Sequence, residues 1–291
     1  MLDLLDRFDC STREALTKIL GSPLSSEQWL QSKLPVSLGG LGLRSAVDHA
    51  AASHVASLLT SETHVRRLMR NSEEEQTIFS LPQSALDDLT ARQGEQATTG
   101  TVWGQTQKML SKRIDSHNLL HLKSQLVDER ERARLESLGL PYAGAWLVAP
   151  PIRALGLHLQ PEEFVMATKL RLGIAMFSSD SPCPACQRPS DVQGDHALCC
   201  SHWGERITRH NLLRDHLHDL AASACLSPVK EGRHLLPGAN RRPADILIHS
   251  WDGGCDAALD VTVVHPLQTE FVSGAALTLQ ALHLIKPMSG K

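Results

Sequence analysis

The chain has 291 residues, of which 42% are hydrophobic and 21% charged, so it is long enough to bury a core and to divide into two or more domains. This balance excludes a disordered or fibrous protein. Lysine and arginine number 29 against 32 acidic residues, and the net charge of -3 excludes a global basic field, so any contact with nucleic acid has to be local. Charges interrupt the first leucines, and no apolar run is long enough for a membrane span, so we expect neither a signal peptide nor a membrane segment.

Helical patterns dominate the first half of the chain. Residues 1–34 have a polar helical pattern, and a further helix is predicted after the glycine-rich stretch 38–43, with Ser45 as its N-cap. The polar residues 71–102 predict a linker. A long helical pattern follows over 105–138, and its run of mixed charges, DERERARLE, predicts a solvated helix face.

The pattern changes toward the C-terminus. Pro161, followed by two glutamates, predicts the start of another helix, and apolar residues recur at helical spacing over 204–225. After Pro228, the apolar runs 246–248 and 259–264 predict short strands. The expected fold class is therefore a mixture of helices and strands, α+β or α/β, with the strands in the C-terminal part.

Four of the seven cysteines lie between positions 183 and 200, which favours an intracellular metal site over a secreted disulfide framework. Cys183 and Cys186 form a CxxC pair, and His196 follows with Cys199 and Cys200. Zinc favours four thiolate or imidazole ligands in a tetrahedron, and a CxxC turn supplies two of them. The spacing C-x2-C-x9-H-x3-C predicts a compact zinc knuckle with Cys200 as the preferred fourth ligand and Cys199 as the alternative.

Two aspartates flank a predicted hairpin. The turn signal Asp252-Gly253 between two apolar runs predicts antiparallel strands. If residue 247 faces residue 260, Asp245 and Asp260 lie on one face as diagonal neighbours, roughly 7 Å apart. Two carboxylates at that separation can share a hard cation such as Mg²⁺. The alternative is an ordinary hairpin with two solvent-facing aspartates.

The order of these segments resembles the C-terminal region of non-LTR retrotransposons of the restriction-like-endonuclease type. In those polyproteins a CCHC zinc knuckle lies downstream of the reverse transcriptase and precedes a nuclease of the PD-(D/E)xK superfamily. The resemblance covers about residues 30–275. Its matching segments are LPVSLGGLGLRSAVDHAAASHVASL, the CxxC pair, GDHALCC, Arg209-His210-Asn211, RRPAD and ALDVTVVHPLQ.

The resemblance implies four consecutive parts. Residues 1–102 would be a helical remnant of the post-polymerase, thumb-like region with a polar linker, and residues 103–180 a helical linker. Residues 181–203 would form the CCHC zinc knuckle. Residues 204–291 would form a restriction-endonuclease-like α/β domain, which we expect to be truncated because the sequence departs from the family pattern after Phe271.

The resemblance also implies catalytic residues. Asp245 and Asp260 would bind the catalytic Mg²⁺, and the 14 residues between them fit the family's separation. Glu231 would be an additional acidic residue beside the metal. The superfamily usually places a lysine two residues after the second acid, where this chain has Thr262; in the retrotransposon branch the lysine comes later, which makes Lys286 the candidate.

Further residues are implied in metal and nucleic-acid binding. Arg209, His210 and Asn211 would support the knuckle or contact the DNA backbone, and Arg241 and Arg242 are placed for phosphate contacts. The zinc ligands that the resemblance implies are Cys183, Cys186, His196 and Cys200.

The implied function is nicking of target DNA in the nucleus, so that a free 3′ hydroxyl primes reverse transcription. The implied cofactors are structural Zn²⁺ and catalytic Mg²⁺, and the partners are target DNA and the element's RNA. No polymerase activity is expected, because Asp87-Asp88 lacks the aromatic residue of a polymerase signature.

Two observations leave other hypotheses open. Thr262 replaces the usual lysine, and residues 204–291 carry nine basic against nine acidic residues, so DNA binding should be weak and sensitive to salt. The second hypothesis is a non-catalytic, zinc-dependent nucleic-acid-binding remnant, and the third is a degenerate reading frame without a selected function.

Overall fold

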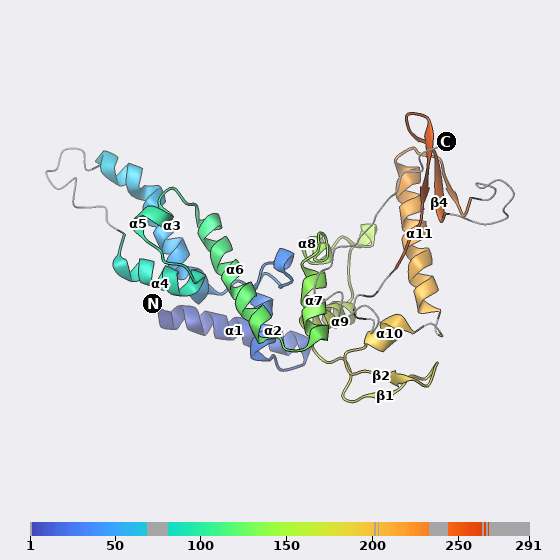
Figure 1. Cartoon of the computed structure of the whole chain (residues 1–291), viewed down its shortest axis with the longest axis horizontal. Coiled ribbons are helices and arrows are strands. Elements are labelled where there is room, and N and C mark those ends of the chain that lie inside the picture. Colours follow the sequence, from blue (N-terminus) through green and yellow to red (C-terminus); the bar gives the residue numbers. More distant parts are fainter. Residues whose placement is uncertain are drawn as a thin grey trace. The chain divides into compact units, whose positions relative to one another are not determined.

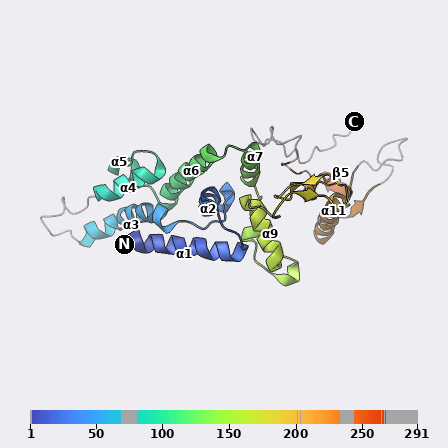
Figure 2. The same ribbon diagram turned by 90° about the horizontal axis from the view of Figure 1, so that it is seen from below.

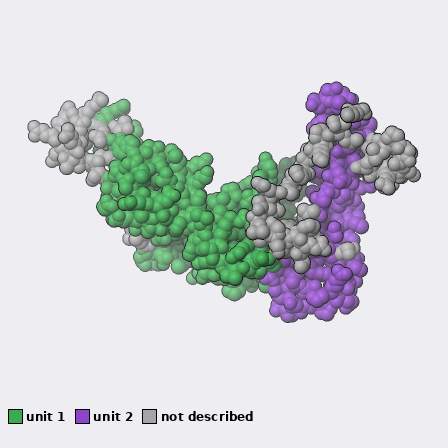
Figure 3. All heavy atoms as spheres, in the orientation of Figure 1, with its two compact units in different colours: residues 1–176, 273–277 green, residues 177–272, 278–291 purple. Residues whose placement is uncertain are grey.

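The computed structural model of the chain contains two compact units, shown in two colours in Figure 3. In the described part of the chain, unit 1 ends at Met176 and unit 2 begins at Phe177. Unit 1 is helical, whereas unit 2 combines helices with two small antiparallel sheets, so the expected mixture of helices and strands is confirmed. The structure describes residues 2–68, 81–200, 202, 204–232, 244–263, 265 and 267.

The helices of unit 1 are visible in Figure 1 and, from a second direction, in Figure 2. Local signals set several of their ends: the Ser25 side chain accepts the Gln28 N–H in a capping box, and the helix predicted at Pro161 begins there. In chain order the elements are α1 (Leu2–Leu20), α2 (Ser26–Lys33), η1 (Val36–Leu38), α3 (Ala46–Leu68), α4 (Gln83–Gln93), α5 (Thr99–Val102), α6 (Gln107–Gln125), α7 (Glu129–Leu138), α8 (Ala145–Val148), η2 (Arg153–Leu155) and α9 (Pro161–Leu172).

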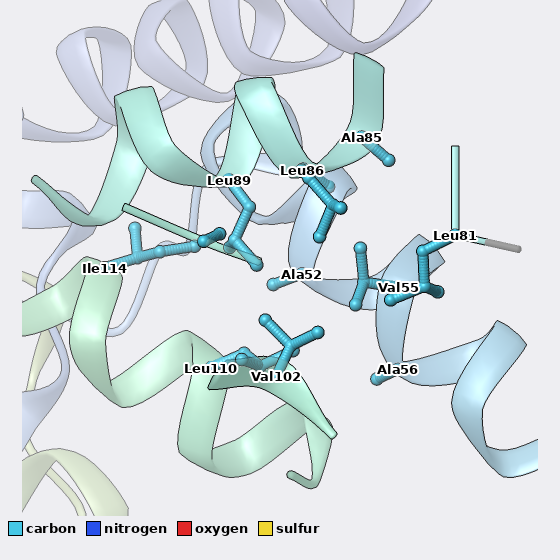
Figure 4. Close-up of a cluster of buried hydrophobic side chains, with 12 residues drawn as sticks. Ala52, Val55, Ala56, Leu81, Ala85, Leu86, Leu89, Val102, Leu110 and Ile114 are labelled. Carbon is cyan, nitrogen blue, oxygen red and sulfur yellow. The ribbon is translucent and has the colours of Figure 1, made fainter. Parts of the chain in front are cut away.

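One hydrophobic core of unit 1 lies between α3, α4, α5 and α6 (Figure 4). It corrects the prediction of a polar linker over 71–102, because the part from residue 81 onward folds into α4 and α5; residues 71–80 of that linker lie outside the described residues. Leu86 and Leu89 recur on one side of α4 and are buried in the same cluster as Val55 of α3, while Asp87 and Asp88 are exposed. The burial of these apolar side chains therefore outweighs the polar composition of the segment.

The long helical pattern over 105–138 is broken into two helices. The Asp128 side chain accepts the Arg130 N–H and caps the start of α7, and α6 ends before this residue, at Gln125. The prediction that the charged run is a solvated face is wrong at Arg134, which is only 5% exposed. Its guanidinium donates to Gln31 Oε1 at 2.9 Å and to the Arg171 carbonyl.

A second buried arginine holds the glycine-rich stretch of unit 1. Arg171 is 2% exposed, and its guanidinium donates to the carbonyls of Gly40 (3.0 Å), Val36 (2.8 Å) and Ala143 (3.3 Å). Desolvation lowers the pKa of Arg171, and the charge of Arg134 adds to this effect. Carbonyl acceptors compensate this burial, because each replaces a hydrogen bond that the guanidinium would otherwise make to water.

We expect Gly40→Ala to destabilise unit 1 by more than about 2 kcal/mol. A Cβ atom at this position would lie 1.9 Å from the Leu34 carbonyl oxygen, a backbone atom that cannot move aside. Gly100→Ala is the matched control, because the nearest atom to its Cβ is the Thr98 hydroxyl at 3.9 Å. Urea unfolding of both variants measures the difference, and equal stabilities would contradict the packing of this stretch.

Unit 2 begins with a small hairpin and a short helix and continues with a long helix and a three-stranded sheet of order β3-β4-β5. Helix α11 packs against β3 and β4, and it lies beside β4 in Figure 1. Ile246, Leu247 and Ile248 of β4 are the buried centre of this sheet. The elements are β1 (Ser181–Pro182), β2 (Pro189–Ser190), α10 (Asp195–Cys199), α11 (Glu205–Ser223), β3 (Pro228–Lys230), β4 (Ile246–Asp252) and β5 (Cys255–Leu259).

The predicted hairpin exists, but its register differs from the expected one. The tip pairs as predicted, with Asp252 opposite Cys255, whereas Ile246 pairs with Leu259 and not with Val261. Two extra residues in β4 form a bulge between the tip and the body, at Ser250, whose φ is 52°. The second strand ends at Leu259 and does not continue through residues 260–263, and residue 264 of the predicted strand lies outside the described residues. Because the shift is two residues, every side chain keeps its predicted face.

No helix in the described ranges combines the length and the apolar character that a bilayer crossing requires.

Candidate metal centres

The first candidate centre begins at the turn between β1 and β2. The Cys183 N–H donates to the Arg188 carbonyl at 2.8 Å, and the Gln187 N–H donates back to the Cys183 carbonyl at 2.8 Å. Gln187 adopts a left-handed φ of 60°, which closes this turn tightly. The turn therefore holds Cys183 and Cys186 close together at one end of the hairpin.

Helix α10 brings the other two ligand candidates to the same place. The Asp191 carboxylate accepts the N–H groups of Asp195 at 3.0 Å and His196 at 2.8 Å, so it caps the helix. The Cys200 N–H donates to the His196 carbonyl at 2.8 Å at the other end. This single helical turn fixes the separation between His196 and Cys200.

The four candidate ligand atoms lie within 4.8 Å of one another. The Sγ atoms of Cys183 and Cys200 are 3.9 Å apart, and Cys186 Sγ is 3.2 Å from His196 Nε2. Desolvation and the neighbouring thiols of Cys183 and Cys200 raise the pKa of the Cys186 thiol, and a bound cation would reverse this effect by stabilising the thiolates. The set can hold a metal ion such as zinc, and it includes Cys200 but not Cys199.

We expect Cys200→Ser to lose the metal and Cys199→Ser to keep about one zinc ion per chain. The two residues are neighbours, so the pair separates loss of a ligand from a general effect of removing a thiol. Zinc content by mass spectrometry and the thermal unfolding of unit 2 are the measurements, because metal binding here is also folding free energy. Equal zinc content in the two variants would contradict Cys200 as the fourth ligand.

The second candidate centre lies where three strands of the other sheet end. The Glu231 N–H donates to the Asp245 carbonyl at 2.8 Å, and the Asp245 N–H donates to the Leu259 carbonyl at 2.9 Å. These bonds continue the backbone contacts one residue beyond the strands, so Glu231, Asp245 and Asp260 lie at the same end of the sheet. The expected pairing of residue 247 with residue 260 is wrong, because Leu247 pairs with Ala258.

The Asp245 carboxylate is the centre of this group. Its Oδ1 accepts a hydrogen bond from His210 Nε2 at 3.1 Å, and its Oδ2 accepts the Val261 N–H at 2.7 Å. Desolvation raises the pKa of the Asp260 carboxyl, the hydrogen bond and negative charge of Asp245 raise this pKa further, and His210 opposes the rise. The two aspartate side chains are thus in contact, and the negative charge of Asp245 disfavours ionisation of Asp260.

Glu231, Asp245 and Asp260 are called the acidic row below. The carboxylate of Glu231 is bound by a cationic side chain. Arg214 of α11 donates to Glu231 Oε1 at 2.8 Å and to Asp215 Oδ1 at 3.0 Å. Lys230 Nζ lies 2.9 Å from the same Asp215 oxygen, and the hydrogen bonds from Lys230 and Arg214 lower the pKa of Asp215. The structure therefore brings Glu231 beside Asp245 and holds it in an ion-pair network.

The remaining predicted residues are placed differently. Arg209 donates to the Leu198 carbonyl of α10, so it supports the knuckle, while His210 faces the aspartates and not the knuckle. Asn211 is half-buried on α11. The other candidates, Lys286, Arg241 and Arg242, lie outside the described residues.

Two features of the site were missed at the level of sequence. Arg214 follows His210 by four residues, a spacing that places both on one helix face and was available as a signal. A pocket of about 360 Å³ opens beside Asp260, at the first turns of α11. It is lined by Gly204, Arg206, Ile207, His210, Val261, Thr262 and Val263.

No protein-family model, no curated protein and no solved structure matches the chain. The chemistry of the two centres therefore has to be inferred from their own residues.

We expect Asp260→Asn to reduce the pH dependence of stability. The folded state binds the Asp260 proton more tightly than the unfolded chain, so the free energy of unfolding falls as the pH rises from the ordinary aspartate pKa through the raised value. The asparagine variant lacks this ionisation. Urea unfolding from about pH 4, near the ordinary aspartate pKa, up to neutral pH, with no divalent cation other than zinc added, measures the difference, and parallel pH profiles would contradict the raised pKa.

Proposed function

We propose that unit 2 is a metal-dependent DNA endonuclease of the restriction-like type, from a retrotransposon reverse transcriptase protein, and that it nicks target DNA. The observation that carries the proposal is the contact between the Asp245 and Asp260 carboxylates. Two acids forced together, with one pKa raised, are unfavourable for folding unless a cation or a shared proton compensates them. Such arrangements cluster at catalytic sites.

Asp245 and Asp260 fit a hard divalent cation. Mg²⁺ is typically bound by one or two carboxylates, with water and substrate phosphate oxygens as the other ligands, so a third protein carboxylate is not required. When bound, Mg²⁺ or Mn²⁺ supplies Lewis-acid chemistry: it promotes ionisation of a water and neutralises charge on the phosphate. The protein's contribution is to hold Asp245 in place through His210 and the Val261 N–H.

The pocket beside the aspartates supports a nucleotide substrate. Ile207, Val261 and Val263 give it apolar walls that suit a sugar or base, and Arg206 lies at the same pocket and is exposed. A guanidinium there can contact a phosphate oxygen next to the scissile bond. The pocket volume of about 360 Å³ lies within the range of small-molecule sites.

The knuckle has a structural part in the proposed enzyme. Zinc would be held by the four ligands of the first centre, and Arg209 joins the knuckle to the helix that carries His210. The proposal includes DNA and the element's RNA as partners and a nuclear location. It also retains weak, salt-sensitive binding, because the nine basic and nine acidic residues of 204–291 cancel.

The test is nicking of supercoiled plasmid at low salt by zinc-loaded protein with added Mg²⁺ or Mn²⁺. We expect the parent to nick, and Asp245→Asn and Asp260→Asn to lose cleavage by about 100-fold or more. Asp252→Asn is the matched control, because Asp252 lies at the exposed tip of the same hairpin. It should cleave like the parent.

A folded, zinc-loaded parent that does not nick with either cation would overturn the proposal. If that protein still binds DNA and loses the DNA as salt is raised, the result would support a zinc-dependent nucleic-acid-binding protein without catalysis. Thr262, in place of the lysine that the superfamily usually has, is the observation that favours this second function.

A further inference from the structure

Two consecutive turns of helix α11 contact the acidic row. His210 contacts Asp245, and Arg214, one turn later, contacts Glu231. Arg214 forms an ordinary ion pair with an acid that the proposed mechanism does not need. His210 is different, because its partner is one of the two proposed metal ligands.

We propose that His210 is a positioning residue that fixes the Asp245 carboxylate in its metal-binding orientation. The inference rests on the proposed nuclease function of this site. His210 is assigned to act through Asp245, because its Nε2 atom forms a hydrogen bond with Asp245 Oδ1. Such a partner is what metal-binding side chains generally have beyond their ligand atoms.

The contacts of Asp245 account for the positioning. Val261 N–H binds Oδ2 at 2.7 Å and His210 Nε2 binds Oδ1 at 3.1 Å, from two separate elements of unit 2. One hydrogen bond leaves a carboxylate free to rotate about the bond to its Cβ, whereas two bonds to different oxygens fix the plane of the group. The side chain of Asp245 is 17% exposed and that of His210 30% exposed, so solvent weakens this contact only in part.

Contacts of two neighbouring residues on α11 fix the position of His210. Arg209, the preceding residue, donates to the Leu198 carbonyl of the knuckle, and Arg214 binds Glu231 at the sheet. Successive residues of a helix point about 100° apart, so Arg209 and His210 reach different elements from the same turn. The knuckle and the acidic row thus define where the His210 ring lies.

Two amide variants separate positioning from packing. Glutamine places an N–H donor near the position of histidine Nε2, whereas the asparagine side chain is one bond shorter and does not reach Asp245. Both are polar and compatible with a helix at this half-buried site. His216 is exposed on the same helix, so His216→Asn is the matched control for loss of a histidine.

The measurement is binding of Mn²⁺ to zinc-loaded full-length protein by calorimetry, counting only the binding that Asp245→Asn removes. We expect His210→Asn to weaken this binding about tenfold or more, His210→Gln to recover most of it, and His216→Asn to leave it unchanged. In the plasmid assay, the Mn²⁺ concentration for half-maximal nicking should rise in His210→Asn, with most of the rate restored at saturating Mn²⁺.

The outcomes separate the inference from the proposed function. If the parent binds no Mn²⁺ that depends on Asp245, both are overturned. If the parent binds Mn²⁺ but His210→Asn binds it equally well, the positioning role alone is overturned. If His210→Gln is as impaired as His210→Asn, the histidine acts through its shape and not through its N–H group, and the positioning role is again overturned.

Discussion

Within the described residues, polar contacts and not a hydrophobic core hold helix α11 in unit 2. None of its 19 residues is buried, although the helix carries five exposed large apolar side chains. Arg209, His210 and Arg214 connect it to α10, β4 and the end of β3 through hydrogen bonds. Such contacts are worth little singly, so the placement of this helix depends on several being made together.

The two units are stabilised in different ways. Unit 1 buries Arg134 and Arg171 and satisfies them with carbonyl and amide oxygens around a large apolar interior. The apolar interior of unit 2, within its described residues, is confined to a few side chains of the sheet and the knuckle cysteines. The segment from Cys183 to Cys200 is too short to bury a core of its own, and a structural metal is a usual means of stabilising a segment of that length.

Patterns within a few residues of each other were predictable from sequence. The spacing of Cys183, Cys186, His196 and Cys200 predicted a cluster that the structure forms, and the turn at Asp252-Gly253 predicted a hairpin. Both predictions work because a short loop limits where its ends can lie. On the same ground, Asp245 and Asp260 were predicted to be neighbours on one face of the hairpin, although the register assumed for them was wrong.

Features that depend on distant partners were not predictable. Nothing near Arg134 in sequence shows that Gln31 and the Arg171 carbonyl will enclose it, so a charged run was assigned to solvent. The segment from residue 81 onward was assigned to a linker because its polar residues outnumber the leucines that meet α3. The position of His210 beside Asp245 depends on how α11 packs on the sheet, a tertiary fact that spacing does not contain.

The bulge at Ser250 affects how the hairpin tolerates insertions and deletions. It absorbs two residues between the hairpin tip and the paired body, so the register at Ile246 is set independently of the register at Asp252. Residues can therefore be added to or removed from the hairpin tip in pairs without moving Asp245 and Asp260, which lie at the other end of the strands. The tip is accordingly the natural place to insert residues, for example an affinity tag, while Gly253 and Gly254 themselves are kept because both have a positive φ.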